Sequence, residues 1–120
     1  MADRLLFISW GRVVAGREEI ALEVFNESVG LYGRLQQDGR IEGFDTVLLS
    51  PTGGTEGYFE VHGTAEQLAA LREDPDWQRS IVDATLIVED MSVVDGYANE
   101  GIADQMAMYQ AAIARVPQRA

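Results

Sequence analysis

The only histidine of this chain, His62, lies in the segment EGYFEVHG, where polar and apolar side chains alternate. Alternate residues of an extended strand point to the same face, so Tyr58, Glu60 and His62 are expected to share one face. A carboxylate beside an imidazole can orient it for general base catalysis. The same trio fits a hydrogen-bonded position at a dimer interface or the solvated face of a sheet. Tyr58, Glu60 and His62 are therefore candidate pocket-lining residues, with no catalytic role assigned to any of them.

The other polar constellations do not predict a metal or cofactor site. Glu19, Glu23 and Glu27 recur at helical spacing, but a di-iron site on helices needs Glu-x-x-His pairs, and the only histidine lies in a predicted strand. The absence of cysteine and the single histidine argue against zinc. The glycine-rich segment PTGGTEG lacks the Gly-Lys-Ser/Thr ending of a phosphate-binding loop. We therefore expect a solvated helix face, a hairpin turn, no metal and no cofactor.

Charge and composition limit the partners. The chain has 120 residues, with 20 acidic residues, 9 basic residues that are all arginine, and a net charge of −11. A negative field of this kind repels phosphate backbones and anionic lipid headgroups, so we expect neither a nucleic acid nor a membrane as partner. The apolar run in Leu5–Trp10 is too short for a membrane span or a secretory signal, which predicts a cytoplasmic protein.

Hydrophobic periodicity predicts an alternation of strands and helices. Strands are expected at 5–10, 44–50, 58–62 and within 84–94, the middle two joined by the PTGGTEG turn. The segment 15–40 reads as a helix that could break at Gly30 and Gly33. Its predicted buried stripe consists of Ile20, Val24, Ser28, Leu31 and Leu35.

A further helical region begins with a predicted capping box at Thr64 and Gln67 and restarts at Asp74 and Pro75. The segment 98–116 reads as a C-terminal helix with one continuous apolar seam, made of Ile102, Met106, Tyr109, Ile113 and Val116.

The order of these elements predicts an α+β fold: a ferredoxin-like βαββαβ unit with a four-stranded antiparallel sheet, followed by a C-terminal helix. The predicted domain organisation is a single domain over residues 1–120. Two helices cover one face of such a sheet, yet LLFI at 5–8 and TLIV at 85–88 are apolar on both sides. We therefore expect a homodimer whose sheets face each other, with the C-terminal helix adding to the contact. Phe7 and Leu48 are the residues predicted to face the partner.

Over roughly Leu5–Val94, the pattern resembles the dimeric α/β-barrel superfamily, and most closely its small uncharacterised bacterial members. The segments WGRVVAGREEIALEVF and GYFEVHGTAEQLAAL carry this resemblance. It implies that two sheets enclose a cavity, which in the enzymes of the superfamily is the active site.

Two functions follow from this resemblance. In the first, a small apolar or aromatic molecule is bound, or turned over without a cofactor, in a cavity on the inner sheet face near His62. In the second, the chain is a non-catalytic structural or interaction dimer with a packed interior. Whether the protein is an enzyme stays open at this point.

Overall fold

The computed structural model describes residues 2–51, 53–117 and 119. The chain forms β1 (Arg4–Trp10), α1 (Glu18–Gln37), β2 (Gly43–Leu48), β3 (Gly57–Gly63), α2 (Ala65–Arg72), α3 (Pro75–Thr85), β4 (Ser92–Tyr97) and α4 (Glu100–Ala114).

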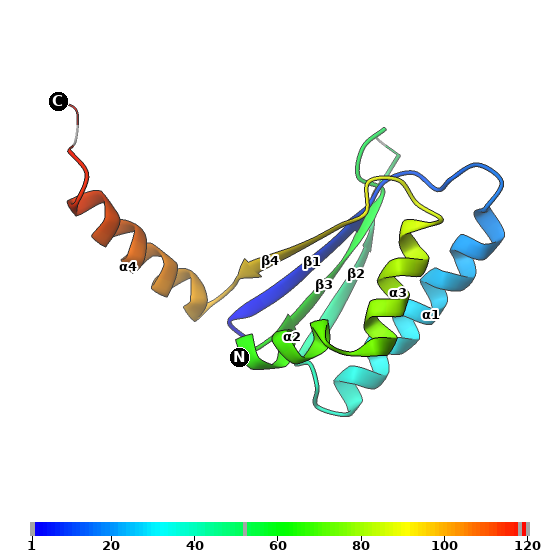
Figure 1. Ribbon diagram of the computed structural model, residues 1–120, viewed down its shortest axis with the longest axis horizontal. Coiled ribbons are helices and arrows are strands. Elements are labelled where there is room, and N and C mark those ends of the chain that lie inside the picture. Colours follow the sequence, from blue (N-terminus) through cyan, green and yellow to red (C-terminus); the bar gives the residue numbers. More distant parts are fainter. Residues whose placement is uncertain (1, 52, 118, 120) are drawn as a thin grey trace.

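The four strands form one antiparallel sheet in the order β2-β3-β1-β4. The helices α1, α2 and α3 lie on one side of this sheet (Figure 1). This is the predicted ferredoxin-like α+β architecture, including the hairpin that joins β2 and β3. One face of the sheet is therefore covered by helices, and we call the other the open face.

Strand alternation sends one set of residues into the core between the sheet and the helices. Leu6 and Ile8 of β1 and Phe59 and Val61 of β3 are buried there. The helix side of the core contributes Leu31, Tyr32, Leu35, Leu68, Leu71 and Trp77. Burial of these side chains is the main source of the fold's stability.

The predicted helix starts between β3 and β4 are confirmed. At the start of α2 the Thr64 hydroxyl accepts from the Gln67 backbone N–H, and the Gln67 side chain accepts from the Thr64 N–H. The chain then restarts as α3, where the Asp74 carboxylate accepts from the N–H groups of Asp76 and Trp77, with Pro75 at the first helical position.

The long first helix differs from the prediction in two respects. It continues without a break from Glu18 to Gln37, through Gly30 and Gly33. Packing against the sheet outweighs the low helix propensity of two glycines. Ile20 is half exposed instead of buried, because the first turn of α1 presents the next residue, Ala21, to the core.

The fourth strand begins later than predicted. The helix α3 continues through Thr85, and the segment 86–89 runs beside 11–14 outside the sheet, through the pairs Gly11 N–H to Glu89 O (2.7 Å) and Val14 N–H to Ile87 O (2.8 Å). Asp90 then adopts a left-handed conformation (φ 56°), which ends this pairing before β4 starts at Ser92. The apolar run TLIV is thus not part of β4, and it supplies no evidence for a doubly apolar strand.

The C-terminal helix α4 projects away from the sheet, on the side opposite α1 and α3 (Figure 1). Its first turn is anchored: the Asn99 side-chain amide donates to Ala2 O (2.6 Å), and a Cβ at Gly101 would lie 2.3 Å from Asp3 O, a closeness only glycine allows. Beyond this anchor the large apolar side chains of α4 are exposed: Ile102, Met106, Met108, Tyr109 and Ile113, with Val116 just after the helix. The helix does not fold back over its own sheet.

Within the described part of the chain, no helix combines the length and apolar character that crossing a membrane requires.

Candidate functional site

A cavity of about 330 Å³ lies between α1, α3 and the helix-covered face of the sheet. Apolar side chains dominate its lining, among them Ile8, Trp10, Phe25, Phe59, Ile81 and Met91. Leu22 of α1 and Leu48 of β2 also line it and are largely exposed, which places them at the mouth. Its size and composition are typical of a site for a small organic molecule.

Aromatic rings form one wall of this cavity. The ring of Phe59 lies 5.3 Å from that of Trp10, 5.7 Å from that of Phe25 and 5.0 Å from that of Tyr32, measured between centroids. Trp10 and Phe25 make an edge-on contact at 6.1 Å. Such clusters offer both ring faces and ring edges, and these favour flat or aromatic ligands.

Tyr32, which also lines the cavity, carries a buried hydroxyl group. Its hydroxyl accepts a hydrogen bond from the Trp77 indole N–H (3.2 Å), which leaves its own hydrogen to donate. Burial raises the pKa of Tyr32 to about 12, although the hydrogen bond from Trp77 opposes the shift. The phenol therefore stays neutral near pH 7 and can act as a hydrogen-bond donor, not as a base.

The other polar side chains that line the cavity make hydrogen bonds to the backbone of the chain itself. The hydroxyl of Ser28 donates to Val24 O (2.8 Å), and that of Ser80 donates to Trp77 O (2.6 Å). Glu18, at the start of α1, accepts from the Gly16 backbone N–H (3.0 Å). None of the described residues that line the cavity is basic. A neutral ligand therefore suits this cavity better than an anion.

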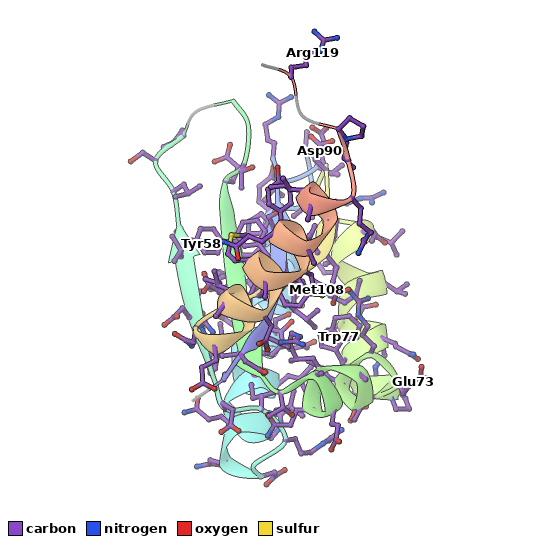
Figure 2. The ribbon with its side chains drawn as sticks, turned by 90° about the vertical axis from the view of Figure 1, so that its left-hand side faces the viewer. Tyr58, Glu73, Trp77, Asp90, Met108 and Arg119 are labelled. Atoms are coloured by element: carbon purple, nitrogen blue, oxygen red, sulfur yellow. The ribbon has the colours of Figure 1, made fainter. Side chains whose placement is uncertain are left out.

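The predicted trio lies on the opposite side of the sheet. Cross-strand register puts Tyr58, Glu60 and His62 on the open face, because Phe59 and Val61 point into the helix-covered core. Figure 2 looks onto the side from which α4 projects and labels Tyr58 and Met108. The three residues share a face, as the strand alternation predicted, but none of them lines the 330 Å³ cavity.

On the open face, His62 lies among carboxylates. Its Nε2 is 3.0 Å from Asp45 Oδ2 and 3.6 Å from Glu60 Oε1. Tyr58 contacts the ring of Phe7 instead, with centroids 4.8 Å apart. The sequence interpretation missed Asp45, which comes from the neighbouring strand β2. Only the register that pairs Asp45 with Glu60 brings it there.

The sequence interpretation also missed the cavity residues of α3 and of the segment that follows it. Ile81, Ala84, Ile87 and Val88 follow one another at steps of three, three and one and all line the cavity. The steps of three residues are typical of a helix and could have indicated these residues. The prediction of a strand over the same apolar run hid this signal.

Structural comparisons place the fold among known proteins. No protein-family model matches the chain, and no curated protein is similar enough in sequence to match it. A conserved protein of unknown function from Bacteroides thetaiotaomicron is similar in structure, with a TM-score of 0.61 and 18% identity over 82% of this chain and 100% of that one.

Two further solved structures share the architecture. One is a dimeric protein of unknown function with a ferredoxin-like fold from Bacteroides fragilis, with a TM-score of 0.60 and 13% identity over 79% of this chain and 96% of that one. The other is SnoaB, a cofactor-independent oxygenase from Streptomyces nogalater. Its TM-score is 0.50, with 15% identity over 82% of this chain and 93% of that one. At the level of the fold, these similarities confirm the resemblance that the sequence pattern indicated.

Proposed function

We propose that this protein binds a small, neutral, apolar or aromatic molecule in the cavity between the sheet and the helices. The observation that carries the proposal is an aromatic-walled cavity of about 330 Å³ that has Tyr32, and no basic residue, among its described lining residues. A bound carbonyl or hydroxyl oxygen could accept from the Tyr32 hydroxyl. Under this proposal, the small-molecule site lies on the helix-covered face, across the sheet from His62.

Two other readings remain as alternatives. Turnover of the bound molecule without a cofactor fits the description of SnoaB, which has a similar fold. The lining lacks a histidine, however, and its tyrosine has a pKa of about 12, so binding is the better supported role. A non-catalytic structural dimer with a packed interior is disfavoured by the cavity itself.

We propose further that the protein is a cytoplasmic homodimer joined through the open faces of two sheets. Leu5 and Phe7 of β1 and Val94 of β4 point to this face, as the cross-strand register requires. The helix α4, whose large apolar side chains are exposed, projects on the same side of the sheet (Figure 1). A second copy would cover both apolar surfaces at once, and the similar protein from Bacteroides fragilis is described as dimeric.

Fluorine NMR of protein labelled with 5-fluorotryptophan tests the binding proposal, since the chain has two tryptophans in different places. Trp10 lines the cavity, whereas Trp77 lies in the core and hydrogen-bonds to Tyr32. Titration with a neutral aromatic probe, such as Nile red or naphthalene, should shift the Trp10 resonance at saturable concentrations. The variant Trp10→Phe assigns the two signals.

Two variants locate the binding. Ala84→Phe places a ring inside the cavity and should abolish the shift, whereas Ala69→Phe adds the same ring on the exposed surface of α2 and should leave it unchanged. Tyr32→Phe should weaken the binding of probes that carry a carbonyl oxygen more than it weakens the binding of naphthalene. If Ala84→Phe binds every probe as well as the unmodified protein does, the cavity is not the binding site.

A further inference from the structure

The acidic residues on the open face of the sheet include an unusual pair. Asp45 of β2 and Glu60 of β3 are direct cross-strand partners, and His62 follows two residues after Glu60. Like charges placed opposite each other on neighbouring strands are destabilising. A cation bound between the two carboxylates would relieve this repulsion.

The described residues on this face supply little positive charge. The cross-strand register puts Gly43, Asp45, Val47, Tyr58, Glu60, His62, Leu5, Phe7, Ser9, Ser92, Val94 and Gly96 there, and none is an arginine. His62 is the single group among them that can become cationic. One proton on its ring would balance only one of the two carboxylates.

The three side chains lie in a ligating arrangement. One ligand atom from each of Asp45, Glu60 and His62 can be chosen so that all three fall within 4.8 Å of one another. Ligand atoms bonded to one metal ion at about 2.1 Å lie roughly 3.0–3.4 Å apart, for octahedral or tetrahedral angles. The separations of 3.0 Å and 3.6 Å from His62 Nε2 are close to this range, and side-chain rotation would bring the Asp45 and Glu60 oxygens, which lie within 4.8 Å of each other, into it.

We propose that Asp45, Glu60 and His62 bind a divalent transition-metal ion of the zinc or manganese type. One imidazole nitrogen and two carboxylate oxygens suit such ions better than calcium or magnesium, which prefer oxygen ligands alone. The two carboxylates balance the charge of the ion. This departs from the sequence expectation of no metal, which considered the histidine without its neighbour on β2.

In a single chain the site is accessible to an ion and to further ligands, and in the dimer proposed above it would lie at the interface between the two sheets. The side chains of His62, Glu60 and Asp45 are 25%, 31% and 68% exposed. Three protein ligands leave at least one coordination position for water or another group. The site is separate from the aromatic cavity, because the sheet lies between them, and it does not depend on the proposed small-molecule function.

The single histidine makes a direct test possible, since every imidazole signal of the untagged chain comes from His62. Substoichiometric Mn²⁺ should broaden the His62 ring resonances selectively. Calorimetric titration with Zn²⁺ alone should give one ion bound per chain. Asp45→Asn and Glu60→Gln preserve side-chain size and should each weaken Zn²⁺ binding by about tenfold or more.

The control is Glu23→Gln, in the exposed acidic row of α1, which should leave Zn²⁺ affinity unchanged. Circular dichroism of each variant establishes that it is folded. If Mn²⁺ leaves the His62 signals sharp, or if Glu23→Gln weakens Zn²⁺ binding as much as Asp45→Asn does, the proposal is overturned. In the first case His62 is only a hydrogen-bonded or protonated bridge between carboxylates, and in the second the binding is diffuse attraction to an acidic surface.

Discussion

The two faces of the sheet are built from the same strands yet differ in how their side chains are covered. On the helix-covered face, Leu6 and Val61 are completely buried, and aromatic rings surround a cavity. On the open face, Leu5 and Phe7 are only partly covered and lie beside the cluster of Asp45, Glu60 and His62. One chain therefore buries the apolar side chains of one face and leaves those of the other face partly exposed.

The difference shows that neighbouring residues of one strand can serve separate purposes. In β1, Leu6 stabilises the fold of a single chain, whereas Leu5, on the other side of the same backbone, is available to a partner. The proposed dimer assigns the projecting helix α4 to the second purpose, because its large apolar side chains are exposed. Substitutions on the two faces should accordingly separate folding from assembly.

The largest expected effect concerns assembly. Phe7→Lys places a charge on the open face and should convert the proposed dimer to a monomer at micromolar concentration, as measured by light scattering. Glu60 lies directly across from position 7 and can pair with the lysine, so the monomer should stay folded.

The matched control is Leu48→Lys. The sequence interpretation placed Leu48 against the partner, but the register of β2 puts it on the helix-covered face, 68% exposed at the mouth of the cavity. This substitution should leave the dimer intact. A monomeric unmodified protein, or dissociation by both substitutions, would rule out the open face as the interface.

The next largest effect is expected on the free energy of unfolding, when two adjacent leucines of β1 are replaced in turn. Leu6→Ala should lower the free energy of unfolding by about 2–5 kcal/mol, because it opens a cavity in a completely buried site. Leu5→Ala should cost about 1 kcal/mol and should weaken dimerisation as well. Urea unfolding at two protein concentrations, with sedimentation analysis, measures both quantities. Equal losses without any change in dimerisation would mean that the two faces are equally covered within one chain.

The smallest effect concerns an ion pair on the helix side of the molecule. The hydrogen bond from Arg40 and the backbone N–H of Trp77 hold the pKa of Asp74 below its usual value of 3.8. A lowered folded-state pKa contributes stability that is present above about pH 4 and is lost as the pH falls through that lowered value.

Asp74→Asn should therefore flatten the decrease in stability below about pH 4 while keeping the helix cap. Asp74→Ala should also lose the cap, at a cost of about 0.5–2 kcal/mol at neutral pH. Thermal unfolding between pH 2 and pH 7 compares the two variants. An unchanged acid profile in Asp74→Asn would show that the Arg40 pair contributes nothing measurable.

Much of the fold could be predicted because its signals are local. The capping residues Thr64 and Asp74 mark where helices start, since their side chains bond to backbone groups only two or three residues away. Alternation in β3 predicted which of its residues share a face, because strand geometry fixes a period of two. The predicted start of β4 was wrong because periodicity could not separate the end of α3 from an extended apolar run. In addition, no glycine marks the left-handed turn at Asp90.

The candidate sites depended on contacts between distant parts of the chain. The sequence by itself determined the order of strands and helices, the acidic charge and the common face of Tyr58, Glu60 and His62, since each follows from composition or from neighbours along the chain. Only the tertiary structure decided that Asp45 joins Glu60 and His62, that Leu48 lies at the cavity mouth and that α4 leaves its own sheet. These outcomes rest on strand register and on the packing of helices against one face, which bring together residues that no local pattern connects.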